Sequence, residues 1–181
     1  MHRDILFFDT ETTGLLRSTE CDLSQQPYIT EICAIRTDHE FNQIGIFETF
    51  VKPPIPIPEK ITQITGINDA TVANAKPFPA IYDKLVEIFI GTRTAVAHNL
   101  SFDMGMLWAE LSRMEAEYKF PWSPVWHCTV EKSMPIEHRR IKLGRLHEIA
   151  TGSPHVGAHR ARNDVLALIT CYKWMRKKGF V

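Results

Sequence analysis

The sequence has few cysteines, and none of them lie close enough in sequence to form a metal-binding or redox pair. Cys21, Cys33, Cys128 and Cys171 include no Cys-x-x-Cys spacing. A zinc knuckle or a dithiol redox motif depends on such a pair. We therefore expect reduced, mostly buried thiols and a fold that needs no disulfide.

The sequence also lacks an excess of charge and any long hydrophobic run. Lys plus Arg and Asp plus Glu both number 21, whereas a protein that covers a long nucleic-acid duplex usually has a basic face. No run approaches the roughly 20 apolar residues that span a bilayer. At the N-terminus only four apolar residues separate Asp4 from Asp9, which is too few for a signal peptide. We therefore expect a cytoplasmic protein without membrane association. A net charge of zero is still compatible with a local basic patch on its surface.

Length and composition are those of one ordinary globular domain. The chain has 181 residues, of which 44% are hydrophobic and 23% charged. A chain of this size buries about 70% of the surface that its unfolded form exposes. No internal repeat, low-complexity segment or linker divides it, so we expect a single domain over residues 1–181.

The first half is patterned as strands. Residues 5–8 form a continuous apolar run, typical of a central strand covered on both faces. Residues 29–36 and 43–51 are rich in β-branched and aromatic residues and predict an antiparallel hairpin. The polar segment 16–28 is predicted to be a connecting loop. The proline-rich segment 53–58 is expected to be extended, and a short helical turn over 61–67 is expected to end at Gly66.

The second half is patterned as helices with further short strands. We expect Asn99 or Ser101 to cap the helix predicted over residues 101–116. The succession of strands, helix, strand and helices indicates an α/β fold with a mixed sheet. The predicted helices cover residues 79–90, 101–116, 143–150 and 162–177, with a strand at 93–97 and a loop entering a short strand at 120–128.

Acidic residues stand where strands end or helices begin. Asp9 and Glu11 are two apart on a strand, so their side chains share one face while Thr10 points to the other. Two such carboxylates repel each other unless a proton or a divalent cation lies between them. Asp103 follows a predicted strand in the first turn of a helix, and Asp164 lies near the start of the last helix. The alternatives are a solvated strand end for Asp9 and Glu11, a capping acid for Asp103 and a solvated helix acid for Asp164.

His159 precedes Asp164 by five positions. On one helix this spacing would separate the two side chains by about 140°. We infer that Asp164 reaches a common site from the helix and His159 from the turn before it. Taken alone, a histidine is more often a surface or core residue than a catalyst.

Three motifs resemble, in order and spacing, the DEDDh 3′ to 5′ exonucleases, the group of the proofreading epsilon subunit of bacterial DNA polymerase III. They are Phe8-Asp9-Thr10-Glu11-Thr12-Thr13-Gly14-Leu15, Ala97-His98-Asn99-Leu100-Ser101-Phe102-Asp103, and His159 with four residues before Asp164. Weaker marks are Thr30-Glu31-Ile32 and Ile64-Thr65-Gly66-Ile67. The resemblance covers nearly the whole chain and implies a ribonuclease-H-like fold, a mixed five-stranded sheet flanked by helices.

The resemblance also implies roles for particular residues. Asp9, Glu11, Asp103 and Asp164 would hold two Mg²⁺ or Mn²⁺ ions, and His159 would be the general base. Hard oxygen ligands suit these cations, and two ions can activate water and stabilise a leaving 3′ oxygen. Residues implied near the 3′ end of a single-stranded substrate are Thr10, Thr12, Leu15, Ile64, Thr65 and Asn99, for several of which ordinary core packing is the alternative.

We expect a metal-dependent 3′ to 5′ exonuclease that releases nucleoside 5′-monophosphates, preferably from single-stranded DNA. RNA 3′-end trimming by the same site and a non-catalytic nucleic-acid-binding module are the alternatives. The cluster Arg139, Arg140, Lys142 and Arg145 is either a phosphate contact or a solvated face. The chain stops about where the nuclease core stops in that group, so we expect at most a weak or transient association with a polymerase. Loop 16–28 is irregular compared with the pattern of that group, so its role in substrate binding stays open.

Overall fold

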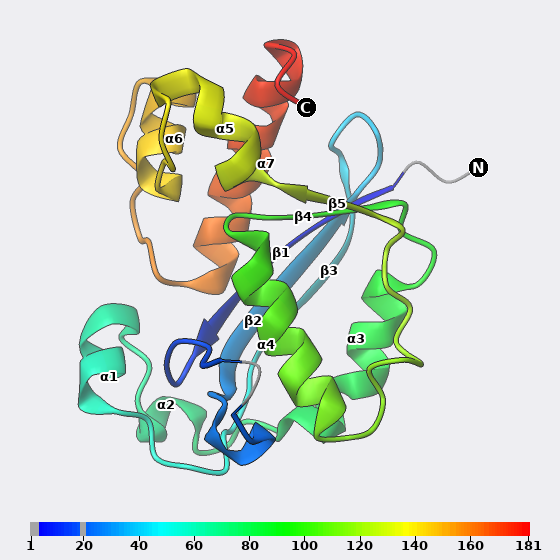
Figure 1. Cartoon of the computed structure of the whole chain (residues 1–181), viewed down its shortest axis with the longest axis vertical. Coiled ribbons are helices and arrows are strands. Elements are labelled where there is room, and N and C mark those ends of the chain that lie inside the picture. Colours follow the sequence, from blue (N-terminus) through cyan, green and yellow to red (C-terminus); the bar gives the residue numbers. More distant parts are fainter. Residues whose placement is uncertain (1–3, 19–20) are drawn as a thin grey trace.

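A computed structural model describes residues 4–18 and 21–181 of the chain. Its described elements are five strands, seven α-helices and two short 3-10 helices (Figure 1). The strands are β1 (Ile5–Thr12), β2 (Ile29–Thr37), β3 (Gln43–Phe50), β4 (Thr94–Ala97) and β5 (Val125–Cys128). The helices are α1 (Glu59–Thr65), α2 (Asp69–Val72), α3 (Tyr82–Phe89), α4 (Leu100–Ser112), α5 (Thr129–Glu137), α6 (Leu143–Thr151) and α7 (Ala161–Lys177), with η1 (Leu23–Gln25) and η2 (Phe78–Ile81) as the 3-10 helices.

The strands form one mixed sheet in the order β3-β2-β1-β4-β5. The hairpin partners β2 and β3 are antiparallel to each other, and β2 is antiparallel to β1. Strands β1, β4 and β5 are parallel. The predicted mixed five-stranded sheet flanked by helices is therefore confirmed, and β1 is its central strand.

Helices cover both faces of the sheet, and alternation along β1 supplies both cores. Leu6 and Phe8 pack in the larger core, which includes residues of α3 and α4. Ile5 and Phe7 pack in a second core with Val165 and other residues of α7. Because both faces of β1 are buried, its first half is a continuous apolar run, as the sequence predicted.

Several boundaries differ from the predicted ones. The helix expected at 79–90 begins as a 3-10 turn, and the helix expected over 101–116 ends at Ser112. Helix α5 was not predicted, because Pro135 lies inside it and its apolar residues form no clear stripe. Gly66 ends α1 with a φ of 72°, as expected for a left-handed C-terminal cap.

Two simpler expectations are met in the described part of the chain. All four cysteines are free, and Cys33, Cys128 and Cys171 are buried. Within residues 4–18 and 21–181, no helix combines the length and apolar character needed to cross a membrane.

Candidate active site

The site begins where β1 extends beyond its parallel neighbour. The pairing of β1 with β4 ends at Phe7 with Val96, although β1 itself continues to Thr12. On the other side β1 stays paired with β2, and Glu11 lies directly opposite Glu31. Asp9 and Glu11 therefore lie on a stretch of β1 that is held from the β2 side and carries no partner strand on the β4 side.

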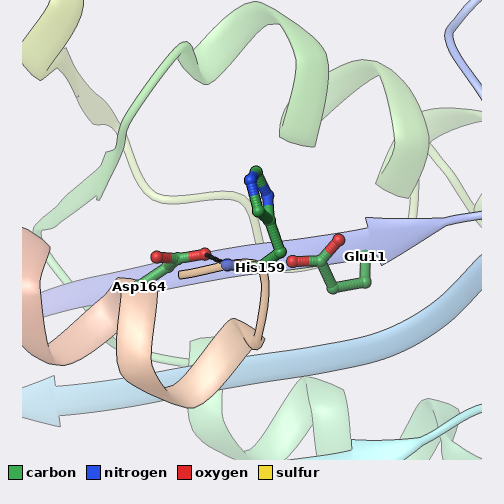
Figure 2. Close-up of side chains that lie close together, drawn as sticks. All are labelled: Glu11, His159 and Asp164. Atoms are coloured by element: carbon green, nitrogen blue, oxygen red, sulfur yellow. Dashed lines mark hydrogen bonds between the residues drawn. The ribbon is translucent and has the colours of Figure 1, made fainter. Parts of the chain in front are cut away.

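Strand alternation directs Asp9 and Glu11 toward α7. They share a face with Phe7, which packs in the α7 core. Ligand atoms of Glu11, His159 and Asp164 all lie within 4.8 Å of one another. Figure 2 shows the Glu11 and Asp164 carboxylates on either side of His159, with Asp164 rising from the first turn of α7.

Asp103 approaches from the opposite face of the sheet. It lies in the first turn of α4 and is only 2% exposed. One of its oxygens, Oδ1, accepts hydrogen bonds from the backbone N–H and the hydroxyl of Thr10, at 3.0 and 2.8 Å. Thr10 therefore points away from Asp9 and Glu11, as predicted, and its side chain binds the third acid.

The carboxylates strongly perturb one another's ionisation. Burial, followed by the charges of Asp103, Asp164 and Glu11, raises the pKa of Asp9 well above its usual value. Burial and the charge of Asp164 raise the pKa of Glu11 to about 8. Burial also raises the pKa of Asp103 to about 7, against the hydrogen bonds from Thr10, which lower it. Without a cation to balance their charges, the folded protein therefore favours the protonated forms of Asp9, Glu11 and Asp103.

The donor set fits divalent cations that prefer oxygen ligands. Asp9, Glu11, Asp103 and Asp164 offer carboxylate oxygens. The raised pKa values of Asp9, Glu11 and Asp103 mark a position where a cation would replace bound protons. The ligand atoms of Glu11, His159 and Asp164 that lie together are two carboxylates and one imidazole without a thiolate, which disfavours a typical structural zinc site.

His159 lies in the turn just before α7, with its side chain exposed. Its backbone has a φ of 64°, the left-handed region that a non-glycine residue seldom adopts. The backbone N–H of His159 donates to Asp164 Oδ2 at 3.0 Å. The imidazole is therefore placed by its backbone, outside the helix, in the position that we inferred from the five-residue spacing.

His155 contacts the same acid and was missed by the sequence analysis. Its Nε2 lies 2.5 Å from Asp164 Oδ1, and its side chain is buried. The loop 152–160 folds back onto α7, which brings together two residues nine apart. Only a structure shows this contact, because no helical or strand period links the two positions.

The residues implied near the substrate differ in how accessible they are. Leu15 is 81% exposed and Ile64 is 48% exposed, so neither belongs to the core. The buried Thr12 donates its hydroxyl to the carbonyl of Gly14, and the buried Thr65 donates to the carbonyl of Ile61. The structure therefore leaves the side chains of Leu15 and Ile64 exposed, while the two threonines stabilise the local turns.

The expected helix cap at Asn99 is wrong. Asn99 occupies the N-cap position of α4 with a φ of 70° but makes no side-chain cap hydrogen bond. Its Oδ1 instead accepts from Arg140 Nη2 at 2.7 Å. Asn99 therefore connects the start of α4 to the segment between α5 and α6.

The basic cluster is partly neutralised. Glu137 forms ion pairs with Arg139 and Arg145, and Arg145 also pairs with Glu148. Arg140 and Lys142 form no ion pair among the described residues. The cluster thus has fewer available charges than its sequence suggests.

Two side chains, those of Gln26 and Arg113, hold the described parts of loop 16–28. Gln26 exchanges hydrogen bonds with the backbone of Arg17 and Ser18. From α4, Arg113 Nη2 donates to the carbonyl oxygens of Leu23, Gln26 and Pro27, which fixes the loop against that helix. Leu15 directly precedes this loop, of which residues 19 and 20 lie outside the described part of the chain.

Comparison with known proteins agrees with these features. A family model described as "Exonuclease", of the RNase T type, matches residues 6–172. The chain belongs to the exonuclease family. The match includes all three acidic segments, and the DEDDh resemblance read from the sequence is confirmed. Exonucleases of the DEDDh type use divalent metal ions.

Relatives of this exonuclease domain are much longer proteins. A Mycobacterium tuberculosis protein named as a bifunctional exonuclease/endonuclease is 33% identical over 168 residues, which cover 89% of this chain and 24% of the relative. The PolC-type DNA polymerase III of Clostridium perfringens is 30% identical, over 97% of this chain and 11% of that protein. The exonuclease chain thus spans a quarter or less of the length of these relatives.

Solved structures share the fold at low sequence identity. The nuclease domain of 3′hExo, described as a DEDDh family member bound to rAMP, superposes with a TM-score of 0.78 at 17% identity, over 98% of this chain and 94% of that one. Escherichia coli ExoI, in a zinc-bound complex with single-stranded DNA, gives a TM-score of 0.77 at 22% identity, over 97% of this chain and 41% of that one. The predicted ribonuclease-H-like fold is confirmed.

Proposed function

We propose that residues 1–181 form one exonuclease domain that removes nucleoside 5′-monophosphates from the 3′ ends of single-stranded DNA. The observation that carries this proposal is the convergence of acids from both faces of the sheet beside an exposed histidine. Within the exonuclease family, that convergence supplies the groups that phosphodiester hydrolysis needs.

Asp9, Glu11, Asp103 and Asp164 would hold two Mg²⁺ or Mn²⁺ ions. When bound, these cations make water a nucleophile near neutral pH and stabilise the leaving 3′ oxygen. Asp9 is the best candidate for a shared ligand, because the charges of Asp103, Asp164 and Glu11 all act on it. Thr10 holds Asp103 in place through two hydrogen bonds to one oxygen, which leaves the other oxygen for a cation.

His159 is proposed as the general base. A positioned imidazole can take the proton of a water molecule, and such a general base contributes about 10² to 10⁴ in rate. Its exposed side chain lies next to Glu11 and Asp164, so it can reach a water molecule at the acids without being buried among them.

The 3′ end of the strand would lie over Leu15 and Ile64. Both side chains are exposed and would supply apolar contacts for nucleobases. The terminal nucleotide would also contact the backbone around Thr10 and Thr12, together with Thr65 and Asn99. The threonines would contribute mainly through steric contact, since all three hydroxyls already form hydrogen bonds within the protein.

RNA is the second candidate substrate, because a structural neighbour was described bound to rAMP. Parallel DNA and RNA substrates separate the two candidates. The PolC-type relatives suggest a polymerase context, and a weak or transient polymerase association stays a prediction. A location in the cytoplasm stays a prediction.

Digestion of 5′-labelled oligonucleotides tests the function. With Mg²⁺ or Mn²⁺, a single-stranded DNA should yield a ladder and nucleoside 5′-monophosphates, and a matched RNA should react more slowly. Asp9→Ala should abolish the ladder. His159→Ala should lose most turnover yet bind Mn²⁺ in calorimetry, whereas Asp103→Ala should lose both. Unchanged activity in Asp9→Ala would refute the site, and binding without any product would indicate a non-catalytic module.

A further inference from the structure

A fifth buried carboxylate, Glu31, lies beside the proposed site. It is 1% exposed and sits on β2 directly opposite Glu11 of β1. The sequence analysis marked Glu31 only as part of a weak motif. A buried carboxylate is costly unless it is paired and hydrogen-bonded, so its contacts indicate its purpose.

Among the described residues, the hydrogen bonds of the Glu31 carboxylate are formed with Arg160 and Ala161 at the start of α7. Arg160 donates from Nη2 to Oε1 at 3.0 Å and from Nε to Oε2 at 3.2 Å. The backbone N–H of Ala161 donates to Oε2 at 3.1 Å. Arg160 is the N-cap residue of α7 and makes no cap hydrogen bond with its own side chain. Glu31 therefore caps this helix from the neighbouring sheet.

The residue that precedes this capped end is His159. Its imidazole is exposed and forms no hydrogen bond with the described residues. The position of the ring therefore depends on the backbone that carries it. Its left-handed backbone is an uncommon conformation that persists only when neighbouring contacts fix it. Asp164 Oδ2 holds His159 from one side, and the Glu31 contacts with Arg160 and Ala161 hold the chain on the other.

We propose that Glu31 and Arg160 are positioning residues for His159. They tie the turn that carries the imidazole to β2, the strand paired with the Asp9 and Glu11 segment of β1. The general base is thereby placed relative to the acids through the sheet, in addition to its contact with Asp164. This inference rests on the proposed role of His159.

Glu31→Gln is the main test, because glutamine keeps the shape and one acceptor but loses the charge that binds Arg160. Changing a group that orients a catalytic residue typically costs about 10- to 100-fold in activity, and we expect a fall of that size in kcat with KM within about twofold. Arg160→Lys keeps the charge without the two-point contact and should show an intermediate loss.

The matched control is the other ion pair between α7 and the sheet. Arg162 Nη1 lies 2.7 Å from Glu48 Oε2 of β3, on the exposed side of the same helix. Glu48→Gln should leave kcat within about twofold, as expected for a surface pair. Urea denaturation and Mn²⁺ calorimetry on every variant ensure that only folded, metal-binding protein is compared.

A double-mutant cycle separates positioning from a purely structural effect. If Glu31 acts through His159, Glu31→Gln should cost less than about twofold in single-turnover rate once His159 is alanine. An equal loss in both backgrounds, or no loss in folded Glu31→Gln, would overturn the proposal. Full activity in His159→Ala alone would instead refute the proposed function, so the two failures are distinguishable.

Discussion

The buried acids predict that the metal-free protein loses stability as pH rises. Glu11 has a pKa of about 8 in the folded protein against a reference value of 4.5. A carboxyl whose pKa is higher in the folded state binds more protons when folded. Its contribution is therefore fully present below pH 4.5 and is lost as the pH rises toward 8.

The size of the effect follows from linkage. For a pKa that moves from 4.5 to about 8, the contribution of Glu11 to the free energy of unfolding falls by about 2 to 3 kcal/mol between pH 5 and pH 7. Asp9 and Asp103, whose pKa values are also raised, act in the same direction. Replacing Glu11 with glutamine should remove the share that belongs to Glu11.

Urea denaturation in EDTA at pH 5, 6, 7 and 8 measures this share. The free energy of unfolding of Glu11→Gln minus that of the wild type should increase by about 2 to 3 kcal/mol from pH 5 to pH 7. The control is Glu40→Gln, at an exposed residue of the β2–β3 turn, for which the same difference should stay constant. Excess Mg²⁺ should reduce the loss in the wild type, because cation binding favours the ionised acids.

A pH-independent difference between Glu11→Gln and the wild type would refute the reasoning. It would mean that the Glu11 carboxyl titrates in the folded protein much as it does in the unfolded chain. The crowding of Asp9, Glu11, Asp103 and Asp164 would then no longer account for a cation requirement.

Two further predictions concern the substrate end and the loop. Leu15→Ala should raise KM for a single-stranded oligonucleotide about 3- to 10-fold while changing stability by less than about 0.5 kcal/mol, because the side chain is 81% exposed; Leu23→Ala is the control, and an unchanged KM would contradict the contact. Arg113→Ala should cost about 3 to 5 kcal/mol in urea denaturation, because it leaves the buried Glu110 unpaired and loop 16–28 unclamped. Arg162→Ala, which breaks an exposed pair, should cost less than about 1 kcal/mol, and equal costs for the two variants would show that the Arg113 clamp carries little stability.

Local pattern was sufficient for the five strands and for most of the longer helices. The apolar run before Asp9 identified the central strand, and two-residue alternation placed Asp9 and Glu11 on one face. The five-residue spacing between His159 and Asp164 separated the helix from the turn. These conclusions hold because strand and helix periods are properties of the backbone and need no knowledge of distant contacts.

Other features required the tertiary structure. The sequence missed α5. It also offered Asn99 or Ser101 as the side-chain cap of α4, whereas the N-cap residue Asn99 makes no cap hydrogen bond and accepts from Arg140 instead. The ion pairs of Glu137 with Arg139 and Arg145 lower the net charge of the basic cluster. The hydroxyls of Thr12 and Thr65 form hydrogen bonds within the protein, while the side chains of Leu15 and Ile64 are exposed.

The sequence by itself thus identified the exonuclease family and the candidate residues of the site, because four acids and a histidine stand at fixed positions on strands and helices. The tertiary structure decided how those groups are held. Asp103 reaches the site only because α4 crosses the opposite face of the sheet, and Glu31 meets Arg160 only because β2 pairs with β1 beside α7. Contacts between residues 90 or more positions apart leave no local period in a sequence, so folding alone brings them together.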